Sequence, residues 1–491
     1  MTTAPAYSAP GHPGSGSRPS APLARHALTP RAHTSWMPWL LIVGLLLAPA
    51  LSGCATAGGT DASRGKARNV ILLIGDGLGP TQFWAASLYS ARILKKELRM
   101  AEAMRAGRTA YLVNDTADAT VTESGAAAGQ IATGQRMRAR TLSVAWDGTT
   151  PVTTIMEMAK RKGLATGLVT TSGITDATPG AFAAHARHRS DEAAVADQQL
   201  AFGVDVLMGG RKQFFLPEIS AGGRKDGRNL LDEARSAGYA VVGDAEELKA
   251  AKGSRILGLF SMGDMAHEID RRFTRQPSLA QMTAKALDVL SRYPKGFFVV
   301  IEGGRIDHAS HRNDAAGTIH DTLAFDEAVG VVLDLARKEP DSLVIVAADH
   351  ETGGMALVGQ GRTGDGHLGL AMEAIQKAQA SFEVVAAELG TSPTPQKIQQ
   401  VAKRYLGIDL TDHEAATVAD DTIRKLDPAN YGHAYLHRLA FVLRPHLGVG
   451  WATDAHTASP LFAFGVGPGS ERIAGLLHNT QLFDIMKSAM E

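Results

Sequence analysis

The chain has 491 residues, of which 44% are hydrophobic and 20% are charged, a composition typical of a large globular protein. Lys plus Arg and Asp plus Glu number 50 each, so there is no excess positive charge to attract nucleic acid, and we expect no nucleic-acid partner. The 17 histidines supply many neutral imidazoles, so metal binding is the first chemistry to look for.

The first 53 residues are predicted to be a leader outside the fold. Residues 1–35 are rich in Pro, Ser, Ala and Gly without a hydrophobic period, and an apolar run follows from Trp36 to Leu51. That run is shorter than the ~20 residues of a membrane-spanning helix, but it has the length of a signal-peptide core. Its end, Leu51-Ser52-Gly53-Cys54, resembles a bacterial lipobox.

Cys54 is the only cysteine of the chain. The lipobox pattern predicts that it carries a lipid and begins the mature chain, residues 54–491. The protein would then be an exported, membrane-anchored lipoprotein in the periplasm or at the cell surface. An anchor helix followed by an incidental cysteine is the alternative. A single cysteine excludes an internal disulfide, so the fold depends on its core and on any bound metal.

From Asn69 onward, apolar β-rich runs alternate with helical patterns. The expected strands are NVILLIG, ATGLVTTS, GVDVLMGG, KGFFVVIEGG, DSLVIVAADH and PLFAFGVGP. Their continuous apolarity predicts parallel strands that are covered on both faces. Helices are predicted over 152–162, 278–292 and 317–338, so the fold class is α/β, with a central, mostly parallel sheet sandwiched between helices. From about 368 to 447 only helical patterns occur, which predicts a helical insertion.

Polar residues collect where the expected strands end, and in open α/β sheets ligands bind at the carboxyl ends of strands. Three strand ends carry them: Asp76 after the first, Glu302 followed by Asp307 and His311 at the second, and adjacent Asp349 and His350 at the third. Asp307 and His311, at i and i+4, share one side of a helical turn and suit a single ion. Any one of these groups could be only a hydrogen-bonded pair. Together they predict a multinuclear metal site.

The segment VTESGAAAG places Ser124 before small residues that are predicted to open a helix. A serine at a helix start is often only an N-cap. A helix start also favours an anion through its backbone N–H groups and dipole, and the small side chains of Gly125 and Ala126 would let a phosphate approach. Ser124 is therefore a candidate nucleophile.

Six segments occur in the order found in alkaline phosphatases: NVILLIGDGLG, VTESGAAAGQIATG, TSGITDATPGAFAAH, VIEGGRIDHASH, VIVAADH and DAHTASP. With the closing PLFAFGVGPGSERIAGLLHNTQLFDIM they span almost all of residues 54–491. The chain therefore resembles the alkaline phosphatases, which are metal-dependent phosphomonoesterases. The resemblance implies one catalytic domain, residues 54–491, that contains the helical insertion.

The resemblance also implies ligands for two Zn²⁺ and one Mg²⁺. One zinc would take Asp307, His311 and His456; the second would take Asp76, Asp349 and His350; magnesium would take Asp76, Thr178 and Glu302. Imidazole with carboxylate suits zinc, whereas an all-oxygen set suits magnesium. Asp176 would lie in the outer shell of the magnesium ion. Arg189 would bind phosphate oxygens, although Arg187 and His188 stand close to it in the sequence.

The implied reaction hydrolyses phosphate monoesters through a phosphoserine at Ser124 and releases inorganic phosphate, with two metals clamping the entering and leaving oxygens. Two positions depart from the family or vary within it. Glu123 stands where aspartate is usual, and its longer side chain is expected to reposition Arg189. His308 either tunes the third metal site or is a hydrogen-bonding residue behind it.

Three other functions fit parts of this sequence less well. A phosphodiesterase or nucleotide pyrophosphatase of the same superfamily commonly uses threonine as nucleophile, whereas Ser124 with Thr178, Glu302 and Arg189 favours monoesters. A sulfatase needs a Cys/Ser-x-Pro-x-Arg setting, which does not surround Ser124. A noncatalytic lipoprotein that binds metal or phosphate would not need a complete set of nucleophile and ligands. A homodimer is a further expectation.

Overall fold

The computed structural model describes residues 66–491 except 219–222, 360–370, 421 and 423–432. The predicted leader, residues 1–53, and the predicted lipid site, Cys54, lie outside the described residues. Within the described part, no helix is both long enough and apolar enough to cross a membrane.

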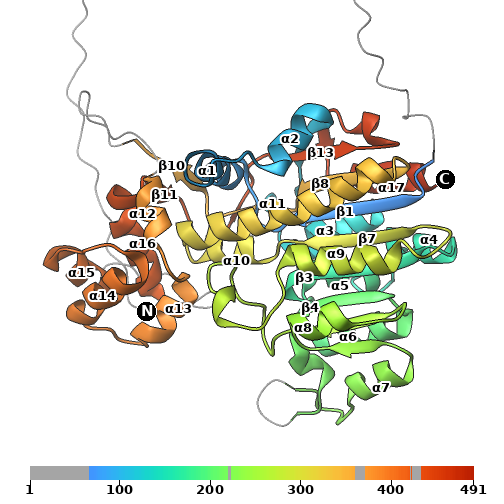
Figure 1. The fold of residues 1–491 in the computed structure, drawn as a ribbon, viewed down its shortest axis with the longest axis horizontal. Helices are drawn as coiled ribbons and strands as arrows, with labels where there is room; N and C mark the ends of the chain where they lie inside the picture. Colours follow the sequence, from blue (N-terminus) through green and yellow to red (C-terminus); the bar gives the residue numbers. More distant parts are fainter. Residues whose placement is uncertain (1–65, 219–222, 360–370, 421, 423–432) are drawn as a thin grey trace, which may run out of the picture. The chain divides into compact units, whose positions relative to one another are not determined.

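The described residues form a central sheet with the strand order β14-β2-β13-β8-β1-β7-β3-β4-β6-β5 (Figure 1). Its strands are β1 (Asn69–Gly75), β2 (Arg108–Val113), β3 (Ala165–Gly173), β4 (Val206–Gly210), β5 (Ala240–Val242), β6 (Ile256–Leu259), β7 (Phe297–Glu302), β8 (Ser342–Ala348), β13 (Leu461–Val466) and β14 (Gly475–His478). Every pairing is parallel except the two made by β13, which runs antiparallel to both β2 and β8.

The strands predicted from continuous apolarity form the middle of this sheet. Every residue of β1, β7 and β8 is buried, because helices cover both faces. The short strands β2, β5, β6 and β14 were not predicted. In β2, exposed and buried residues are mixed, and Tyr111 remains 57% exposed. A half-covered strand such as β2 lacks a continuous apolar signal, whereas β5, β6 and β14 have only three or four residues each and are too short to show one.

The helices pack on the sheet in two groups. One group comprises α1 (Pro80–Tyr89), α2 (Arg99–Ala106), α9 (Leu279–Leu290) and α11 (Ala315–Lys338). The other comprises α3 (Ser124–Thr133), α4 (Ile155–Arg161), α5 (Ala177–Ala183) and α17 (Gln481–Met490). Figure 1 shows α9 and α11 lying across the sheet. The predicted α/β fold, with a mostly parallel sheet between helices, is confirmed.

Residues 372–447 contain a second, smaller hydrophobic core. The helices there are α12 (Met372–Lys377), α13 (Phe382–Leu389), α14 (Pro395–Val401), α15 (Asp412–Ala419) and α16 (Ala434–Leu447). The buried side chains of α13, α14, α15 and α16, among them Phe382 and Leu436, form a cluster separate from the core around the sheet. The buried residues of α12, Met372 and Ile375, belong to the core around the sheet. Parts of the predicted insertion, residues 368–370, 421 and 423–432, lie outside the described residues.

Candidate active site

Four neighbouring strands, in the order β8-β1-β7-β3, end at one edge of the sheet and carry six of the predicted site residues there. Asp349 and His350 follow β8, Asp76 follows β1, Glu302 is the last residue of β7, and Asp176 and Thr178 come shortly after β3. Parallel pairing aligns these strand ends, since Ile74 lies opposite both Glu302 and Ala347. The sheet therefore gathers residues from distant parts of the chain.

The first cluster consists of Asp76, Asp349 and His350, which are all buried. Nε2 of His350 lies 3.4 Å from Oδ1 of Asp76 and 3.3 Å from Oδ2 of Asp349. One ligand atom from each residue lies within 4.8 Å of the others. These are the residues predicted to hold the second zinc, and one ion could contact all three.

The second cluster is built from α10 (Arg305–His311) and the small strand β12 (His456–Thr457). Nε2 of His311 lies 3.0 Å from Nε2 of His456 and 3.3 Å from Oδ1 of Asp307, while Nε2 of His456 lies 3.7 Å from that oxygen. The ring of His350 stacks on that of His456, with centroids 3.7 Å apart. The two clusters are therefore adjacent.

Gly77 allows the first loop to approach α10. Its φ of +69° is a conformation that side chains rarely adopt. A Cβ at this position would lie 2.8 Å from Cα of Asp307 and 2.9 Å from Oγ1 of Thr352. The backbone N–H of Gly77 donates to Oδ1 of Asp349 at 3.1 Å. The glycine after Asp76 thus brings both clusters together.

Four buried oxygens of the predicted ligands have no hydrogen-bond partner among the described residues: Oδ1 of Asp76, Oγ1 of Thr178, Oε2 of Glu302 and Oδ2 of Asp349. Burial, together with repulsion from neighbouring carboxylates, raises the pKa of Asp349 to about 8 and that of Glu302 to about 7. Burial also lowers the pKa of His350 well below its usual range, so this imidazole is neutral. Unpaired oxygens, crowded carboxylates and neutral imidazole fit cation binding.

Ser124 is the first residue of α3, and its Oγ lies 3.2 Å from Nε2 of His350. The N-cap of α3 is Glu123, whose carboxylate accepts hydrogen bonds from the N–H groups of Gly125 and Ala126 at 3.0 and 2.7 Å. The capping role considered for Ser124 therefore belongs to Glu123. Those two N–H groups, at the helix start that is expected to favour an anion, are therefore bonded to the Glu123 carboxylate.

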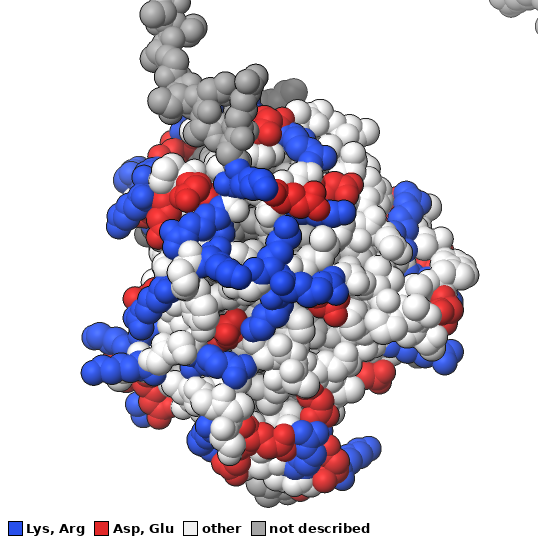
Figure 2. All heavy atoms as spheres, turned by 90° about the vertical axis from the view of Figure 1, so that its right-hand side faces the viewer, with Lys and Arg blue, Asp and Glu red and all other residues white. Residues whose placement is uncertain are grey.

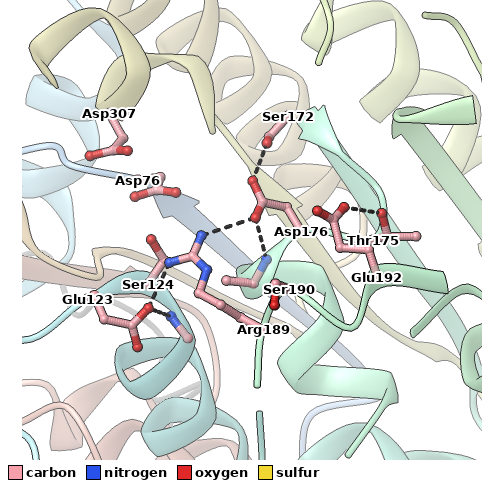
Figure 3. A network of polar contacts seen from close by, with 12 residues as sticks. Asp76, Glu123, Ser124, Ser172, Thr175, Asp176, Arg189, Ser190, Glu192 and Asp307 are labelled. Atoms are coloured by element: carbon pink, nitrogen blue, oxygen red, sulfur yellow. Dashed lines mark hydrogen bonds and ion pairs between the residues drawn. The ribbon is translucent and has the colours of Figure 1, made fainter. Parts of the chain in front are cut away.

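Arg189 lies over Ser124, held between two carboxylates (Figure 3). Its Nη1 donates to Oε2 of Glu123 at 2.7 Å, and its Nη2 donates to Oδ1 of Asp176 at 3.0 Å. Arg187, the neighbouring candidate, is exposed. The guanidinium is thus fixed beside the candidate nucleophile by the N-cap residues of α3 and α5.

Arg211 is a residue of this region that the sequence interpretation missed. Its Nη2 lies 3.1 Å from Oδ2 of Asp176, while its other nitrogens pair with Glu192 and Asp264 at 2.8 Å. Although burial acts in the opposite direction, Arg211 and Arg189 hold the pKa of Asp176 below its usual range. Arg211 follows β4 directly, so the strand-end pattern could have identified it.

His308 is buried, and its Nδ1 lies 2.8 Å from Nη1 of Arg305 and 3.7 Å from Oδ2 of Asp264. Burial lowers the pKa of His308 to about 4, so the ring is neutral. Of the two roles weighed for His308, these contacts support a hydrogen-bonding residue behind Asp307.

Comparison with known proteins agrees with this arrangement. The sequence model of the alkaline phosphatase family matches residues 67–491. Alkaline phosphatases 3 and 4 of Bacillus subtilis (strain 168) are 32% and 30% identical to this chain, covering 90% and 91% of it and 95% of each relative. The crystal structure of Thermus thermophilus alkaline phosphatase has a TM-score of 0.80 at 32% identity, covering 91% of this chain and 96% of that one. The chain therefore belongs to the alkaline phosphatase family, whose members hydrolyse phosphate monoesters.

Proposed function

We propose that this chain hydrolyses phosphate monoesters with Ser124 as the nucleophile, at a site that holds two Zn²⁺ and one Mg²⁺. The observation that carries the proposal is the placement of Ser124. Its Oγ lies between the His350 cluster and the guanidinium of Arg189, so a phosphoryl group on this oxygen would meet both.

The donor types support the assignment of the three ions. Asp307, His311 and His456 would hold one zinc, and Asp76, Asp349 and His350 the other, because both sets combine carboxylate with imidazole. Asp76, Thr178 and Glu302 offer only oxygen, which suits magnesium. When bound, the zinc ions would favour the ionised forms of the Ser124 hydroxyl and of an attacking water, and would stabilise the charge that develops on the leaving oxygen.

The chain's own residues have separate parts in the reaction. Oγ of Ser124 would form a bond to phosphorus while the bond from phosphorus to the ester oxygen breaks, and the alcohol leaves after taking up a proton. Water would then attack the phosphoserine, break the bond to Oγ and release inorganic phosphate. Arg189 would bind two nonbridging oxygens throughout, because its planar fork matches their spacing.

Glu123 and Asp176 would keep that fork in place. Both carboxylates bond to Arg189, and each is itself anchored, Glu123 by backbone N–H groups of α3 and Asp176 by Arg211 and Ser172. A guanidinium oriented before substrate arrives loses little further freedom on binding. Glu123, with its longer side chain, therefore contacts Arg189 directly.

Ser124 and the planar guanidinium of Arg189 favour a phosphomonoesterase over the phosphodiesterase alternative. A diester has one fewer charged nonbridging oxygen that the guanidinium can bind. A noncatalytic role leaves the placement of Ser124 beside Arg189 unexplained.

Phosphoenzyme trapping tests the nucleophile. Wild-type protein incubated with radiolabelled phosphate and quenched in acid should carry label on Ser124, whereas Ser124→Ala should carry none while keeping its zinc and magnesium. Ser190→Ala, which removes a nearby exposed hydroxyl, should label like wild type. Label on the Ser124→Ala variant, or loss of its metal, would show that Ser124 has another role.

We further propose that the mature protein is exported and anchored through a lipid on Cys54, and that it forms a homodimer. The lipobox-like segment supports the anchor. After a high-salt wash that removes electrostatically bound protein, Cys54→Ala should be found in the soluble fraction and wild type in the membrane fraction, with the same specific activity. Light scattering of that soluble protein would give the mass of the assembly. Wild-type protein without a lipid would exclude the anchor, and a monomeric mass would exclude the dimer.

A further inference from the structure

The edge of the sheet opposite the metal clusters carries exposed cations. Lys66 and Arg68 precede β1, Lys162 follows α4, and Lys295 precedes β7; all four are exposed. We call them the basic face. Figure 2 views the molecule from the side on which Figure 1 places α4 and the end of α17, and it shows Lys and Arg side chains gathered across the middle of that surface.

Contacts between the segments show that the four cations are neighbours. The N–H of Ala67 donates to the carbonyl of Ala489 at 2.7 Å, and Nζ of Lys162 donates to the carbonyl of Met490 at 3.3 Å. The backbone of Arg68 lies against Gly296, and Nζ of Lys295 lies beside Gly163. Within the described residues, none of the four forms an ion pair with a carboxylate.

Helix electrostatics do not account for this cluster. Lys162 is the C-cap of α4, where a cation complements the helix dipole. Lys66, Arg68 and Lys295 lie outside helices, so no dipole favours their charge. Exposed Asp341 and Glu491 lie on segments that contact Arg68 and Lys162, but the four cations, from three separate segments, outnumber these side chains and make a surface that attracts an anionic partner.

The chain itself indicates which partner. Cys54 precedes Lys66 by twelve residues (66 − 54), which can span at most ~40 Å when fully extended. A lipid on Cys54 would therefore keep Lys66 and Arg68 within that distance of a bilayer. We infer that the basic face binds the anionic phospholipid surface of the membrane that holds the lipid. The inference rests on the proposed anchor for its biological setting, but the binding itself does not need the lipid.

This docking would set the orientation of the active site. β1 runs from the basic face at Asn69 to the metal clusters at Asp76, and a seven-residue strand is about 20 Å long. That length exceeds the Debye length of about 8 Å at physiological salt. The site would then face away from the membrane. At that distance the negative charge of the lipid would not lower the concentration of phosphate dianions near the site.

Vesicle binding of the predicted mature chain, residues 54–491 with Cys54→Ala, tests the inference without the apolar run of the leader, which would itself bind lipid. This protein should bind phosphatidylcholine vesicles that contain phosphatidylglycerol, bind pure phosphatidylcholine much more weakly, and dissociate as salt rises. Adding Lys66→Gln, Arg68→Gln and Lys295→Gln should lower the affinity by about two powers of ten, at roughly fivefold for each charge. Monoester hydrolysis should not change, because none of the three contacts the site.

The matched control removes three exposed cations from residues 372–447, the helical segment: Lys397→Gln, Lys403→Gln and Arg404→Gln. This variant should bind vesicles like its Cys54→Ala parent. Equal losses in both triple variants would mean that net charge, and not the basic face, drives binding. Equal binding to neutral vesicles, or none to anionic ones, would overturn the inference.

A label gives an independent readout, because Cys54 is the only cysteine. In the Cys54→Ala background, Pro294→Cys beside Lys295 and Ser392→Cys in the helical segment each offer one exposed site for an environment-sensitive dye. Anionic vesicles should shift the emission at position 294 and leave position 392 unchanged. A shift at 392 alone would place another surface against the membrane. Failure of the lipid anchor would appear only in cell fractionation of wild type, and failure of the phosphatase proposal only in the activity assay.

Discussion

The carboxylate of Glu123 both caps α3 and holds Arg189. Its Oε1 accepts from the N–H groups of Ala126 and Arg140, and its Oε2 accepts from Gly125 and Arg189. Although burial acts against ionisation, Arg189 and these N–H groups hold the pKa of Glu123 below its usual range. The residue therefore remains charged and fixes Arg189 relative to Ser124.

The Arg189 fork predicts a selective loss of monoester hydrolysis. Hydrogen bonds to charged groups contribute about 1.5–3 kcal/mol, so Arg189→Ala should lower kcat/KM for a monoester by roughly one to two powers of ten. Diester hydrolysis should fall less, because the diester offers fewer charged oxygens to the fork. Inhibition by inorganic phosphate should weaken in parallel with the monoester loss. Steady-state assays with both ester classes and with phosphate measure all three effects.

Arg187→Ala is the matched control, since it removes an exposed guanidinium only two positions away. This variant should keep kcat/KM for the monoester, kcat/KM for the diester and inhibition by phosphate near the wild-type values. If Arg189→Ala reduced both ester classes equally, Arg189 would be a structural residue, and a loss in the control would shift the phosphate contact to Arg187.

At the scale of elements, one buried carboxylate joins two helices. Oδ1 of Asp314 accepts from the N–H of Gly317 and caps α11, while its Oδ2 accepts from the N–H of Phe382 at the start of α13. Removing one cap typically costs about 0.5–2 kcal/mol. Asp314→Ala should therefore destabilise the protein by up to about twice the cost of a single cap. The stability of Asp314→Asn should fall between those of wild type and Asp314→Ala, because an amide keeps one accepting oxygen.

Thermal unfolding of the metal-loaded protein measures this effect. Asp244→Ala is the comparison, because Asp244 caps one helix, α8 (Ala245–Ala250), and its other oxygen pairs with exposed Arg275. Its loss of stability should be smaller than that of Asp314→Ala. Equal melting temperatures for Asp314→Ala and wild type would mean that the carboxylate does not hold the helical segment to the sheet domain.

At the scale of the molecule, the candidate ligands tie together segments from Asp76 to His456. Metal binds this arrangement only when the chain is folded, so each ion at a thousand times its Kd should add about 4 kcal/mol to stability. Chelation should abolish activity and lower the melting temperature, and zinc with magnesium should restore both. Full activity after chelation, with metal absence confirmed by elemental analysis, would contradict a metal-dependent site.

The metal-free protein should also lose stability as the pH rises. Burial raises the pKa of Asp349 to about 8 and that of Glu302 to about 7 in the folded chain, whereas unfolded carboxyls titrate near 4. Between those values the folded state binds more protons than the unfolded state, so its stability falls with pH. Below about pH 6.5 the lowered pKa values of His308 and His350 act in the opposite direction, so denaturant unfolding of the chelated protein from about pH 7 to 8 checks the sign. Stability that rises over this range would show that the carboxylates are not crowded.

Sequence by itself determined the fold class and the strand-end residues. A buried strand and the residue after it are local features, so Asp76, Glu302 and the Asp349-His350 pair could be located from apolar runs alone. The resemblance to alkaline phosphatases supplied the remaining ligands and Ser124, since His456 comes from a loop pattern without periodicity. The Cys54 lipid stays a prediction.

Only the tertiary structure decided how the parts meet. The antiparallel direction of β13 depends on pairing with β8 and β2, which lie far away in sequence. Arg189 is distinguished from Arg187 by its two carboxylate partners, and the link from Arg211 to Asp176 joins separate strand ends. Apolar periodicity indicates which residues are buried, but it does not indicate which residues they pack against. Packing therefore selected these partners.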